Sequence, residues 1–262
     1  MPPARKLALI TGASGGMGAE YAKLLGGDGY DLALVARSAD KLAAVGTAMR
    51  AKYGVDVVTV AQDLSLPDAA DAVVVQIPQC DVLINNAGFA SNGRFDRIGE
   101  GRLTQEIVLD VLTLTRLTRA YLPAMIARGS GKILNIASTA GFLPGPFMAV
   151  YYACKAYVLS FSQALAEELR GTGVTVTCVC SGATATGFAE RAGATGSLLF
   201  KLPVSNAADM ARAGYRGMLR GKDVVVPWPP SNRLVEISAR LLPRRLLLWI
   251  SRKAVEDERN DV

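Results

Sequence analysis

The chain has 262 residues, half of them hydrophobic and 20% charged, and its formal net charge is +6. It contains no histidine, which excludes Ser-His-Asp and Cys-His nucleophiles, histidine metal ligands and a histidine general base. Proton transfer would therefore depend on tyrosine, lysine, cysteine or a carboxylate. The length suits one large α/β domain, and we expect a single domain over residues 1–262.

Seven short apolar runs are candidate strands, separated by longer stretches of helical character. The runs are 7–11, 31–36, 55–61, 81–85, 132–137, 174–179 and 223–227. Their continuous apolarity indicates strands that are covered on both faces. The pattern predicts a Rossmann-type, doubly wound α/β fold, with a seven-stranded parallel sheet and helices on both faces.

Helix boundaries follow from capping residues. Ser38 is a candidate N-cap for a helix that Gly54 closes. The stretch 103–128 reads as one long helix with a possible kink at Pro123, and its apolar part around 107–125 is a candidate subunit contact. Residues 187–204 contain three glycines and no helical period, which predicts a mobile substrate loop.

The four cysteines, at 80, 154, 178 and 180, lie in apolar stretches, which indicates a reduced, cytoplasmic protein. Cys178 and Cys180 have no second pair nearby, so we predict no metal site. The first apolar run is too short for a signal-peptide core, and no run approaches the ~20 apolar residues of a membrane span. We expect no transmembrane segment.

The last part of the chain predicts a C-terminal helical extension over 228–262, within the same domain. Its basic residues alternate with apolar runs; they include Arg233, Arg240, Arg244, Arg245, Arg252 and Lys253. The segment could contact an anionic membrane surface, contact another subunit, or cap the fold with a solvated basic face. We expect no nucleic-acid partner.

A glycine-rich turn follows the first predicted strand: Thr11-Gly12-Ala13-Ser14-Gly15-Gly16-Met17-Gly18. Gly12 would permit the tight turn, Gly16 the approach of backbone to a pyrophosphate, and Gly18 close packing of helix on sheet. The helix N-terminus would offer free N–H groups to the phosphates. No Lys-Ser or Lys-Thr follows, so the turn is not a P-loop. A dinucleotide site is predicted, with a plain tight turn as the alternative.

The end of the second strand bears on which dinucleotide binds. An acidic residue there would bind the ribose 2′-OH of NAD, but the chain has Arg37. A charge-assisted contact with a 2′-phosphate is worth about 1.5–3 kcal/mol, roughly a tenfold to hundredfold preference for NADP(H). The alternative is a surface arginine beside the helix cap at Ser38.

Tyr151 and Lys155 are four residues apart on a predicted helix, so they share a face. A nearby ammonium lowers the pKa of a phenol, which would let Tyr151 exchange protons near neutral pH. Ser138 ends the fifth predicted strand, thirteen residues before Tyr151. The three side chains form a candidate catalytic group.

Together these motifs resemble the short-chain dehydrogenase/reductase family, in its compact single-domain form. The likeness covers about residues 6–186 and includes Asp63-Leu64, Asn85-Asn86-Ala87-Gly88, and Ser181-Gly182-Ala183-Thr184-Ala185-Thr186 after successive strands. The resemblance implies that Tyr151 is the general acid/base, Ser138 holds the carbonyl oxygen, and Lys155 tunes Tyr151 and binds the nicotinamide ribose. The candidate cofactor residues are Gly12, Ser14, Gly15, Gly16, Met17, Gly18, Arg37, Asp63, Leu64, Asn86, Ala87, Gly88, Tyr151, Lys155, Ala183, Thr184 and Thr186.

The chain departs from this family at two places. Ser181-Gly182-Ala183 replaces a proline-glycine turn, and we expect cofactor binding to survive the change. Asp110 occupies the place of the family's catalytic asparagine, so we count it with the catalytic candidates. An ionised Asp110 would pair with Lys155 and raise the pKa of Tyr151, whereas a protonated one could replace the amide as a donor. Altered activity is expected, unless the alignment is shifted and Asp110 is a solvated helix residue.

These features predict an NADP(H)-dependent carbonyl reductase or alcohol dehydrogenase acting on a small carbonyl or alcohol substrate, with an apolar ketone or aldehyde preferred. The candidate substrate residues are Ser138, Phe142, Met148, Tyr151 and Phe188. The alternative is an NADP(H)-binding sensor or scaffold with weak turnover because of Asp110. The resemblance also implies a homodimer or homotetramer.

Overall fold

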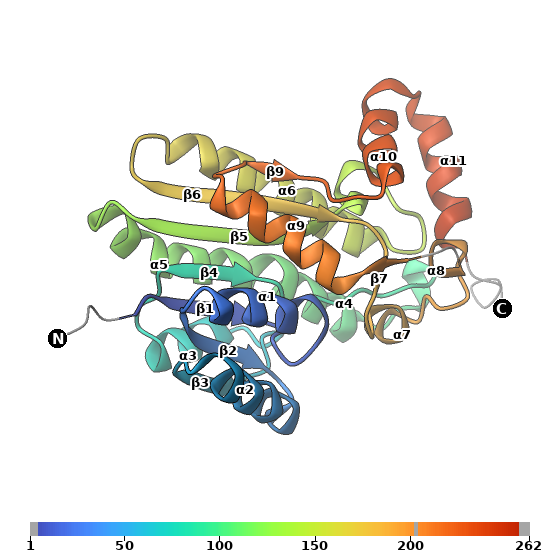
Figure 1. Cartoon of the computed structure of the whole chain (residues 1–262). Coiled ribbons are helices and arrows are strands. Elements are labelled where there is room, and N and C mark those ends of the chain that lie inside the picture. The colour runs from blue at the N-terminus through green and yellow to red at the C-terminus, as the bar shows by residue number, and fades with distance from the viewer. Residues whose placement is uncertain (1–4, 202–203, 257–262) are drawn as a thin grey trace.

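The computed structural model describes residues 5–201 and 204–256. Its main feature is a parallel sheet of seven strands in the order β3-β2-β1-β4-β5-β6-β9 (Figure 1). The strands are β1 (Leu7–Thr11), β2 (Asp31–Ala36), β3 (Val57–Ala61), β4 (Val82–Asn85), β5 (Gly131–Ser138), β6 (Val174–Ser181) and β9 (Val224–Val225). The predicted seven-stranded Rossmann-type sheet is confirmed, although β3 and β9 are shorter than the apolar runs that predicted them.

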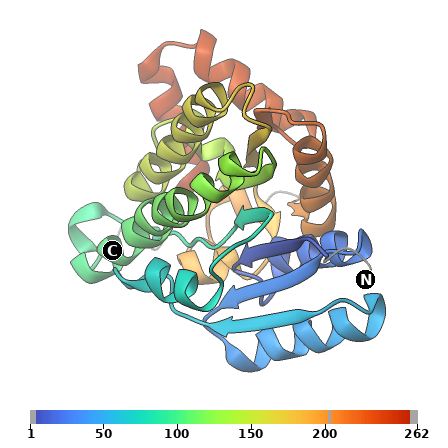
Figure 2. The ribbon, with the colours of Figure 1, turned by 90° about the vertical axis from the view of Figure 1, so that its left-hand side faces the viewer.

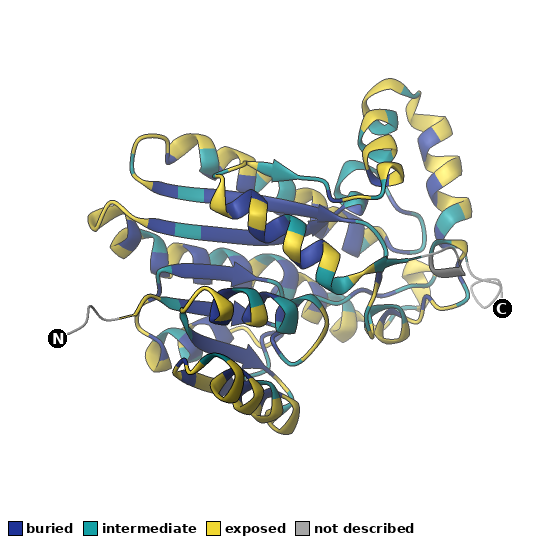
Figure 3. Ribbon diagram, viewed as in Figure 1, coloured by how far each residue is buried: buried dark blue, intermediate teal, exposed yellow. Residues whose placement is uncertain are grey.

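The strands are apolar throughout because both faces of the sheet are covered. Along β1, Ala8 and Ile10 face one core, whereas Leu9 between them faces the other. The first core is closed by α1 (Gly16–Gly27), α2 (Ala39–Tyr53) and α9 (Ala207–Leu219), and the second by α3 (Ala69–Gln76), α5 (Leu114–Ala127) and α6 (Ala149–Glu168). The helices lie on both sides of the sheet (Figure 1, Figure 2), and the strands are mostly buried (Figure 3).

The predicted cap residues of α2 occupy the two ends of that helix. Gly54 adopts a left-handed conformation with φ 63°, and its N–H donates to the Arg50 carbonyl. Ser38 is the N-cap residue, but its side chain accepts no capping hydrogen bond. The hydroxyl of Ser38 is therefore left for other partners.

The prediction of one long helix over 103–128 is confirmed in outline, because helical residues follow one another without a break from Glu100 to Ala127. Helix α4 (Glu100–Ile107) passes into a π-helical segment, η2 (Val108–Thr113), before α5 begins at Leu114. Pro123 lies inside α5 and does not end it. No glycine or proline stands in η2, so the sequence pattern does not mark the change. The wider turn carries three buried residues, Val108, Asp110 and Thr113.

The segment 187–204, predicted to be a mobile substrate loop, is partly helical. This segment contains two short helices, α7 (Phe188–Ala192) and α8 (Leu198–Lys201), and residues 202–203 lie outside the described residues. Gly193 ends α7 in a left-handed conformation, and Ala192 and Ala194 are buried. Short β7 (Thr184–Ala185) and β8 (Ser205–Asn206) pair on either side of the segment. A glycine that looked like a loop residue is therefore a helix terminator.

Two helices follow β9, α10 (Pro230–Leu241) and α11 (Arg244–Val255). They project together from one end of the molecule, at the upper right of Figure 1. Residues 257–262 of the predicted extension lie outside the described residues. Two 3-10 turns complete the secondary structure, η1 (Phe95–Arg97) and η3 (Thr139–Phe142).

Candidate active site

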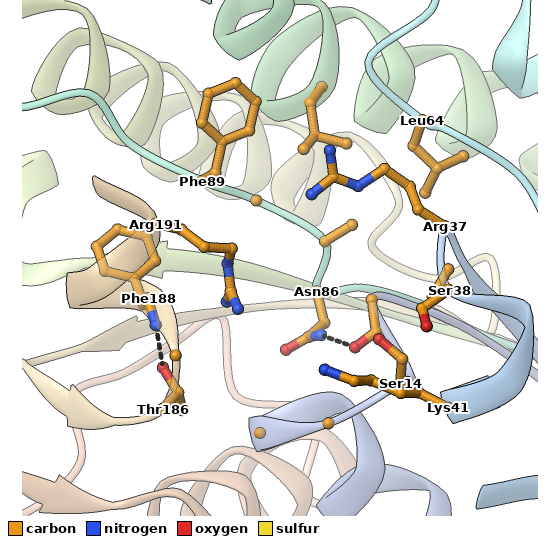
Figure 4. Close-up of a pocket in the computed structure, with 18 of the residues that line it drawn as sticks. Ser14, Arg37, Ser38, Lys41, Leu64, Asn86, Phe89, Thr186, Phe188 and Arg191 are labelled. Carbon is orange, nitrogen blue, oxygen red and sulfur yellow. Dashed lines mark hydrogen bonds between the residues drawn. The ribbon is translucent and has the colours of Figure 1, made fainter. Parts of the chain in front are cut away.

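A pocket of about 570 Å³ opens at the carboxyl edge of the sheet, where the strand order reverses between β1 and β4 (Figure 4). Ligands of doubly wound folds bind at such reversal points. Most of the predicted cofactor residues line the pocket; they are Gly12, Ser14, Gly15, Gly16, Met17, Arg37, Asp63, Leu64, Asn86, Ala87, Gly88 and Thr186. The structure thus brings together turns that follow β1, β2, β3, β4 and β7.

The glycine-rich turn has the geometry of a phosphate cradle. Gly12 and Gly16 have φ values of 68° and 54°, which side chains disfavour. A Cβ on Gly18 would lie 2.3 Å from the Gly12 carbonyl oxygen, so α1 packs directly on the turn. A Cβ on Gly15 would meet no atom within 4 Å, and the first turn of α1 holds no acidic residue. This open, uncharged helix N-terminus fits a pyrophosphate.

Thr11 connects this turn to the loop after β4, a role that sequence reasoning did not assign. Its hydroxyl accepts hydrogen bonds from the backbone N–H groups of Asn86 and Ala87, at 2.9 and 3.0 Å. The Asn86 amide in turn donates to the carbonyl oxygens of Thr11 and Gly12. Asn86 therefore holds the two loops together as well as lining the pocket. A short polar residue ending a buried strand is the signal that could have identified Thr11.

Three polar residues surround one end of the pocket at the β2–α2 turn. Arg37, Ser38 and Lys41 all line it, on the same side in Figure 4. The Arg37 guanidinium lies 4.0 Å from the Asp63 carboxylate, and its side chain is 63% exposed. Ser38 and Lys41 were not among the predicted site residues. Lys41 lies in the first turn of α2, close behind Arg37 in the sequence, and a second basic residue so near the end of β2 is the signal that could have identified it.

The candidate catalytic residues meet beside the pocket. Tyr151 and Lys155 share one face of α6, with the lysine Nζ 5.5 Å from the centre of the phenol ring. Ser138 ends β5, and its hydroxyl accepts a hydrogen bond from the Ala140 N–H at 3.1 Å. The Phe188 ring, which lines the pocket, lies 5.4 Å from the Tyr151 ring. Both sets of predicted residues therefore converge at one edge of the sheet.

Asp110 lies against this group rather than in solvent. Its Oδ1 accepts a hydrogen bond from Lys155 Nζ at 3.0 Å, and both side chains are buried. Lys155 also donates to the Ile136 carbonyl oxygen at 3.2 Å. A Cβ on Gly88 would lie 2.5 Å from the same Asp110 oxygen, so only glycine leaves room for this pair. Desolvation raises the pKa of Asp110, and the Asp110 carboxylate raises the pKa of Lys155 despite burial.

The pKa of Tyr151 differs from the sequence expectation of an acidified phenol. Burial raises it, and this effect exceeds the lowering by the Lys155 ammonium and by the Ser138 hydroxyl. The carboxylates of Asp110 and Glu106 raise it further. The net pKa lies above the ordinary phenol value because burial outweighs the influence of the lysine, which the two carboxylates also partly offset.

A model of the short chain dehydrogenase family matches residues 6–196 of this sequence. The chain belongs to the short-chain dehydrogenase family. The family binds a nicotinamide cofactor, which confirms the predicted cofactor class. It also explains why a phosphate cradle and a Ser-Tyr-Lys group share one edge of the sheet.

Curated relatives in the family match the same part of the chain. A very-long-chain 3-oxoacyl-CoA reductase of Rattus norvegicus is 37% identical over 178 residues, covering 66% of this chain and 57% of the rat protein. A ketoacyl reductase of Nostoc sp. is 38% identical over 183 residues, covering 68% of this chain and 63% of the relative. The match therefore spans less than two thirds of the length of either relative.

Solved structures of family members superpose on nearly the whole chain. A short-chain dehydrogenase from Sphingobium yanoikuyae in complex with NADPH is 35% identical, with a TM-score of 0.81, covering 90% of this chain and 93% of that one. A bulky-bulky ketone specific alcohol dehydrogenase from Comamonas testosteroni is 30% identical, with a TM-score of 0.77, covering 97% and 98%.

Five of the predicted cofactor residues do not line the nucleotide pocket. Gly18, Tyr151, Lys155, Ala183 and Thr184 are not part of its lining. The Thr184 hydroxyl donates to the Gly182 carbonyl oxygen at 2.9 Å, and Thr184 pairs with Ser205 in the small sheet. These contacts bury Thr184 and turn it away from a direct role in the lining.

The predicted substrate residues separate into different surroundings. Met148 packs into a small core with Tyr151 and Tyr152. Phe142 lines a second, mostly apolar pocket of about 510 Å³ between the segment 141–146 and α11. Of the predicted substrate residues, only Phe188 lines the nucleotide pocket. Phe89, Leu109 and Arg191 line it too, and sequence reasoning missed all three. Those three residues come from a loop, a π-helical turn and a short helix, none of which had a sequence motif.

Proposed function

We propose that this protein is an NADP(H)-dependent carbonyl reductase or alcohol dehydrogenase with Tyr151 as its general acid/base. The observation that carries the proposal is the convergence of Ser138, Tyr151 and Lys155 beside a pocket that fits a dinucleotide. When bound, the nicotinamide cofactor supplies or accepts the hydride. Side chains of the protein carry out the proton transfer and hold the substrate oxygen.

Each of the three side chains has a distinct role in this proposal. The Tyr151 hydroxyl donates its proton to the carbonyl oxygen during reduction, and the phenolate takes a proton back during oxidation. The Ser138 hydroxyl donates a hydrogen bond to the same oxygen and orients it. Lys155 stabilises the phenolate by its charge and would hold the nicotinamide ribose.

The phosphorylated cofactor is favoured by the charge at the β2–α2 turn. Arg37 and Lys41 are both cationic, both line the pocket, and Ser38 lies between them in the sequence. Such a site suits a 2′-phosphate. The Sphingobium yanoikuyae relative, solved in complex with NADPH, supports this choice.

An apolar ketone or aldehyde is the substrate class that the lining favours. Phe89, Leu109 and Phe188 line the pocket, and the Phe188 ring lies against Tyr151, so apolar groups of a substrate would be buried there. The names of the relatives, a 3-oxoacyl-CoA reductase and a bulky ketone dehydrogenase, support a ketone.

NADPH oxidation with a panel of ketones, aldehydes and 3-oxoacyl thioesters tests the proposed activity. We expect turnover with apolar ketones and none after Tyr151→Phe. An inactive wild-type protein on every member of the panel would contradict the proposal.

The second candidate is an NADP(H)-binding sensor or scaffold with weak turnover. The observation that favours it is the buried ion pair of Asp110 with Lys155, which ties up the ammonium that would otherwise act on Tyr151. This candidate would be supported over the enzyme if the wild type bound NADPH without turnover and if Asp110→Asn restored turnover.

We also propose that the protein works in the cytoplasm as a homodimer or homotetramer. Ile107, Leu112, Ile126 and Tyr157 are exposed apolar side chains on α4, η2, α5 and α6. They would form the subunit contact predicted around 107–125. Gel filtration with light scattering tests this, and Leu112→Glu should yield monomer.

The C-terminal helices are proposed to contact an anionic membrane surface. No helix in the described part of the chain is both long and apolar enough to cross a bilayer. Exposed apolar residues repeat at helical spacing on α10 and α11; they are Leu234, Ile237, Leu241, Leu246, Trp249 and Ile250. Arginines flank them, as expected for a helix that lies in the interface.

A further inference from the structure

A second buried carboxyl group accompanies Asp110. Glu106 lies on α4, four residues before Asp110, and is 0% exposed. Neither carboxyl oxygen of Glu106 has a hydrogen-bond partner in the described part of the chain, and the same holds for Asp110 Oδ2. Such unpartnered buried oxygens are costly if they carry charge. The proposed mechanism does not account for Glu106.

The groups that face Glu106 come from four segments. Asp110 lies on η2, Lys155, Tyr151 and Cys154 on α6, Arg102 on α4 itself, and Ser91 in the loop after β4. Lys155 is committed to Asp110. The Arg102 guanidinium is committed to Ser91 and to the backbone carbonyl oxygens of Ala90 and Arg191. Glu106 therefore has two weakly acidic neighbours on α6 and one carboxylate on η2, and it forms no ion pair with any residue that the structure describes.

Only one of the two carboxyl groups in this buried cluster has a cation in contact with it. Lys155 pairs with Asp110, whereas the Arg102 guanidinium hydrogen-bonds to neutral oxygens and acts on Glu106 only through its charge. If both were ionised, one negative charge would lack a partner, so a proton stays on the pair. Burial raises the pKa of Glu106 to about 7, and the Asp110 charge adds to the rise, while Ser91, Arg102 and Lys155 oppose it. Glu106 is thus the group that gains or loses this proton near neutral pH.

We propose that Glu106 and Asp110 together hold one proton beside Lys155, with the proton on Glu106, and that Glu106 is a positioning residue which sets the pH range in which Tyr151 can act as a base. This inference rests on the proposed function for its effect on turnover. With Glu106 protonated, the carboxyl pair carries one negative charge, which Lys155 balances. When Glu106 loses its proton to solvent, an extra negative charge faces Tyr151 and favours the neutral phenol.

The consequence differs between the two directions of the reaction. Alcohol oxidation needs the Tyr151 phenolate, so it is held back once Glu106 ionises. Carbonyl reduction uses the neutral phenol, so the ionisation of Glu106 does not remove the form of Tyr151 that it needs. The carboxyl pair therefore moves the rise of oxidation to higher pH, because Glu106 is ionised above about pH 7.

The test compares Glu106→Gln with the wild type in both directions across pH. We expect kcat/KM for alcohol oxidation at pH values above 7 to rise several-fold in Glu106→Gln, with little change in carbonyl reduction at acid pH. Glu100→Gln, on the exposed first turn of the same helix, is the matched control and should leave both profiles unchanged. An oxidation profile that rises at the same pH in wild type and Glu106→Gln would overturn the proposal.

A second measurement does not depend on activity and separates this proposal from the proposed function. A folded-state pKa raised above the unfolded value means that ionisation destabilises the fold as pH rises from the unfolded value to the folded one. Near pH 4.5, the Tm of Glu106→Gln and of Glu106→Met should therefore equal or lie below the Tm of the wild type. At pH 8, the Tm of both variants should have risen by several degrees relative to the wild-type Tm. A Tm difference that does not change between these pH values would show that Glu106 does not titrate there, whatever the enzyme does.

Discussion

At the scale of single residues, the proton affinity of Tyr151 results from opposing influences. Burial raises the pKa of the phenol, Lys155 and Ser138 lower it, and Asp110 and Glu106 raise it again. A raised pKa keeps Tyr151 protonated at neutral pH, which suits donation to a carbonyl. We expect reduction to proceed at pH 6–7 and oxidation to increase steadily toward alkaline pH. Profiles of kcat/KM in the two directions would check this.

Removing the Tyr151 hydroxyl should abolish most of the activity. We expect Tyr151→Phe to lower kcat by about 10²–10⁴-fold, the usual contribution of a positioned general acid. NADPH affinity, measured by fluorescence titration, should remain because the ring still packs beside Phe188. Tyr152→Phe is the matched control, since that hydroxyl interacts with Ser251 instead. Equal losses in the two variants would assign the effect to packing.

Replacing Asp110 tests the ion pair. In the wild type, the Asp110 carboxylate pairs with Lys155 at 3.0 Å and raises the pKa of Tyr151. Asp110→Asn removes this carboxylate, so the pKa of Tyr151 should fall. The alkaline limb of the oxidation profile should therefore move to lower pH, because Lys155 acts on the phenol unopposed. Rates and profiles identical to those of the wild type would exclude Asp110 from the mechanism.

Arg37 should determine the choice between cofactors. Arg37→Ala would remove a charge-assisted contact of about 1.5–3 kcal/mol, raising KM for NADPH roughly tenfold to a hundredfold. KM for NADH should change little, since NADH has no 2′-phosphate. Arg212→Ala, an exposed arginine on α9, serves as the control. If KM rose equally for both cofactors, Arg37 would not read the phosphate.

At the scale of secondary-structure elements, different glycines of the turn between β1 and α1 serve folding stability and cofactor binding. A Cβ on Gly18 would lie 2.3 Å from the Gly12 carbonyl oxygen, whereas one on Gly15 would meet nothing within 4 Å. We expect Gly18→Ala to cost about 1–3 kcal/mol of folding free energy through overpacking. Gly15→Ala should leave Tm unchanged and weaken cofactor binding, because the added methyl group would occupy the cradle. Denaturant titration and NADPH titration of both variants check these expectations.

The strands could be predicted from sequence because their apolarity is continuous, and the turn after β1 because its glycines follow a strand. Other features depend on contacts that no local pattern records. The π-helical turn at Val108–Thr113 has no breaker residue, and Glu106 looks like the solvated face of an amphipathic helix. Thr11 acquires its role only when the loop after β4 comes beside it. Long-range packing, rather than propensity, decides these positions.

At the scale of the whole molecule, the helical pair α10–α11 is the part that stands apart from the sheet (Figure 1). We expect the full chain to sediment with vesicles that contain phosphatidylserine and to remain free with phosphatidylcholine alone. Trp249, 60% exposed on α11, should contribute through its apolar ring, so Trp249→Ser should weaken sedimentation. Val75→Ser, an exposed apolar site on α3, is the control. Sedimentation unaffected by Trp249→Ser would indicate that these helices do not meet lipid.

Gly88 belongs to two neighbourhoods at once. It forms part of the wall of the nucleotide pocket, and its Cα faces the Asp110 oxygen and the Lys155 ammonium so closely that no methyl group would fit. A nucleotide bound against Gly88 would therefore also lie next to the Asp110–Lys155 ion pair. We therefore expect nucleotide affinity to vary with pH and, by thermodynamic reciprocity, nucleotide binding to release or take up a fraction of a proton. Titration calorimetry in buffers of different ionisation enthalpy would count that fraction directly.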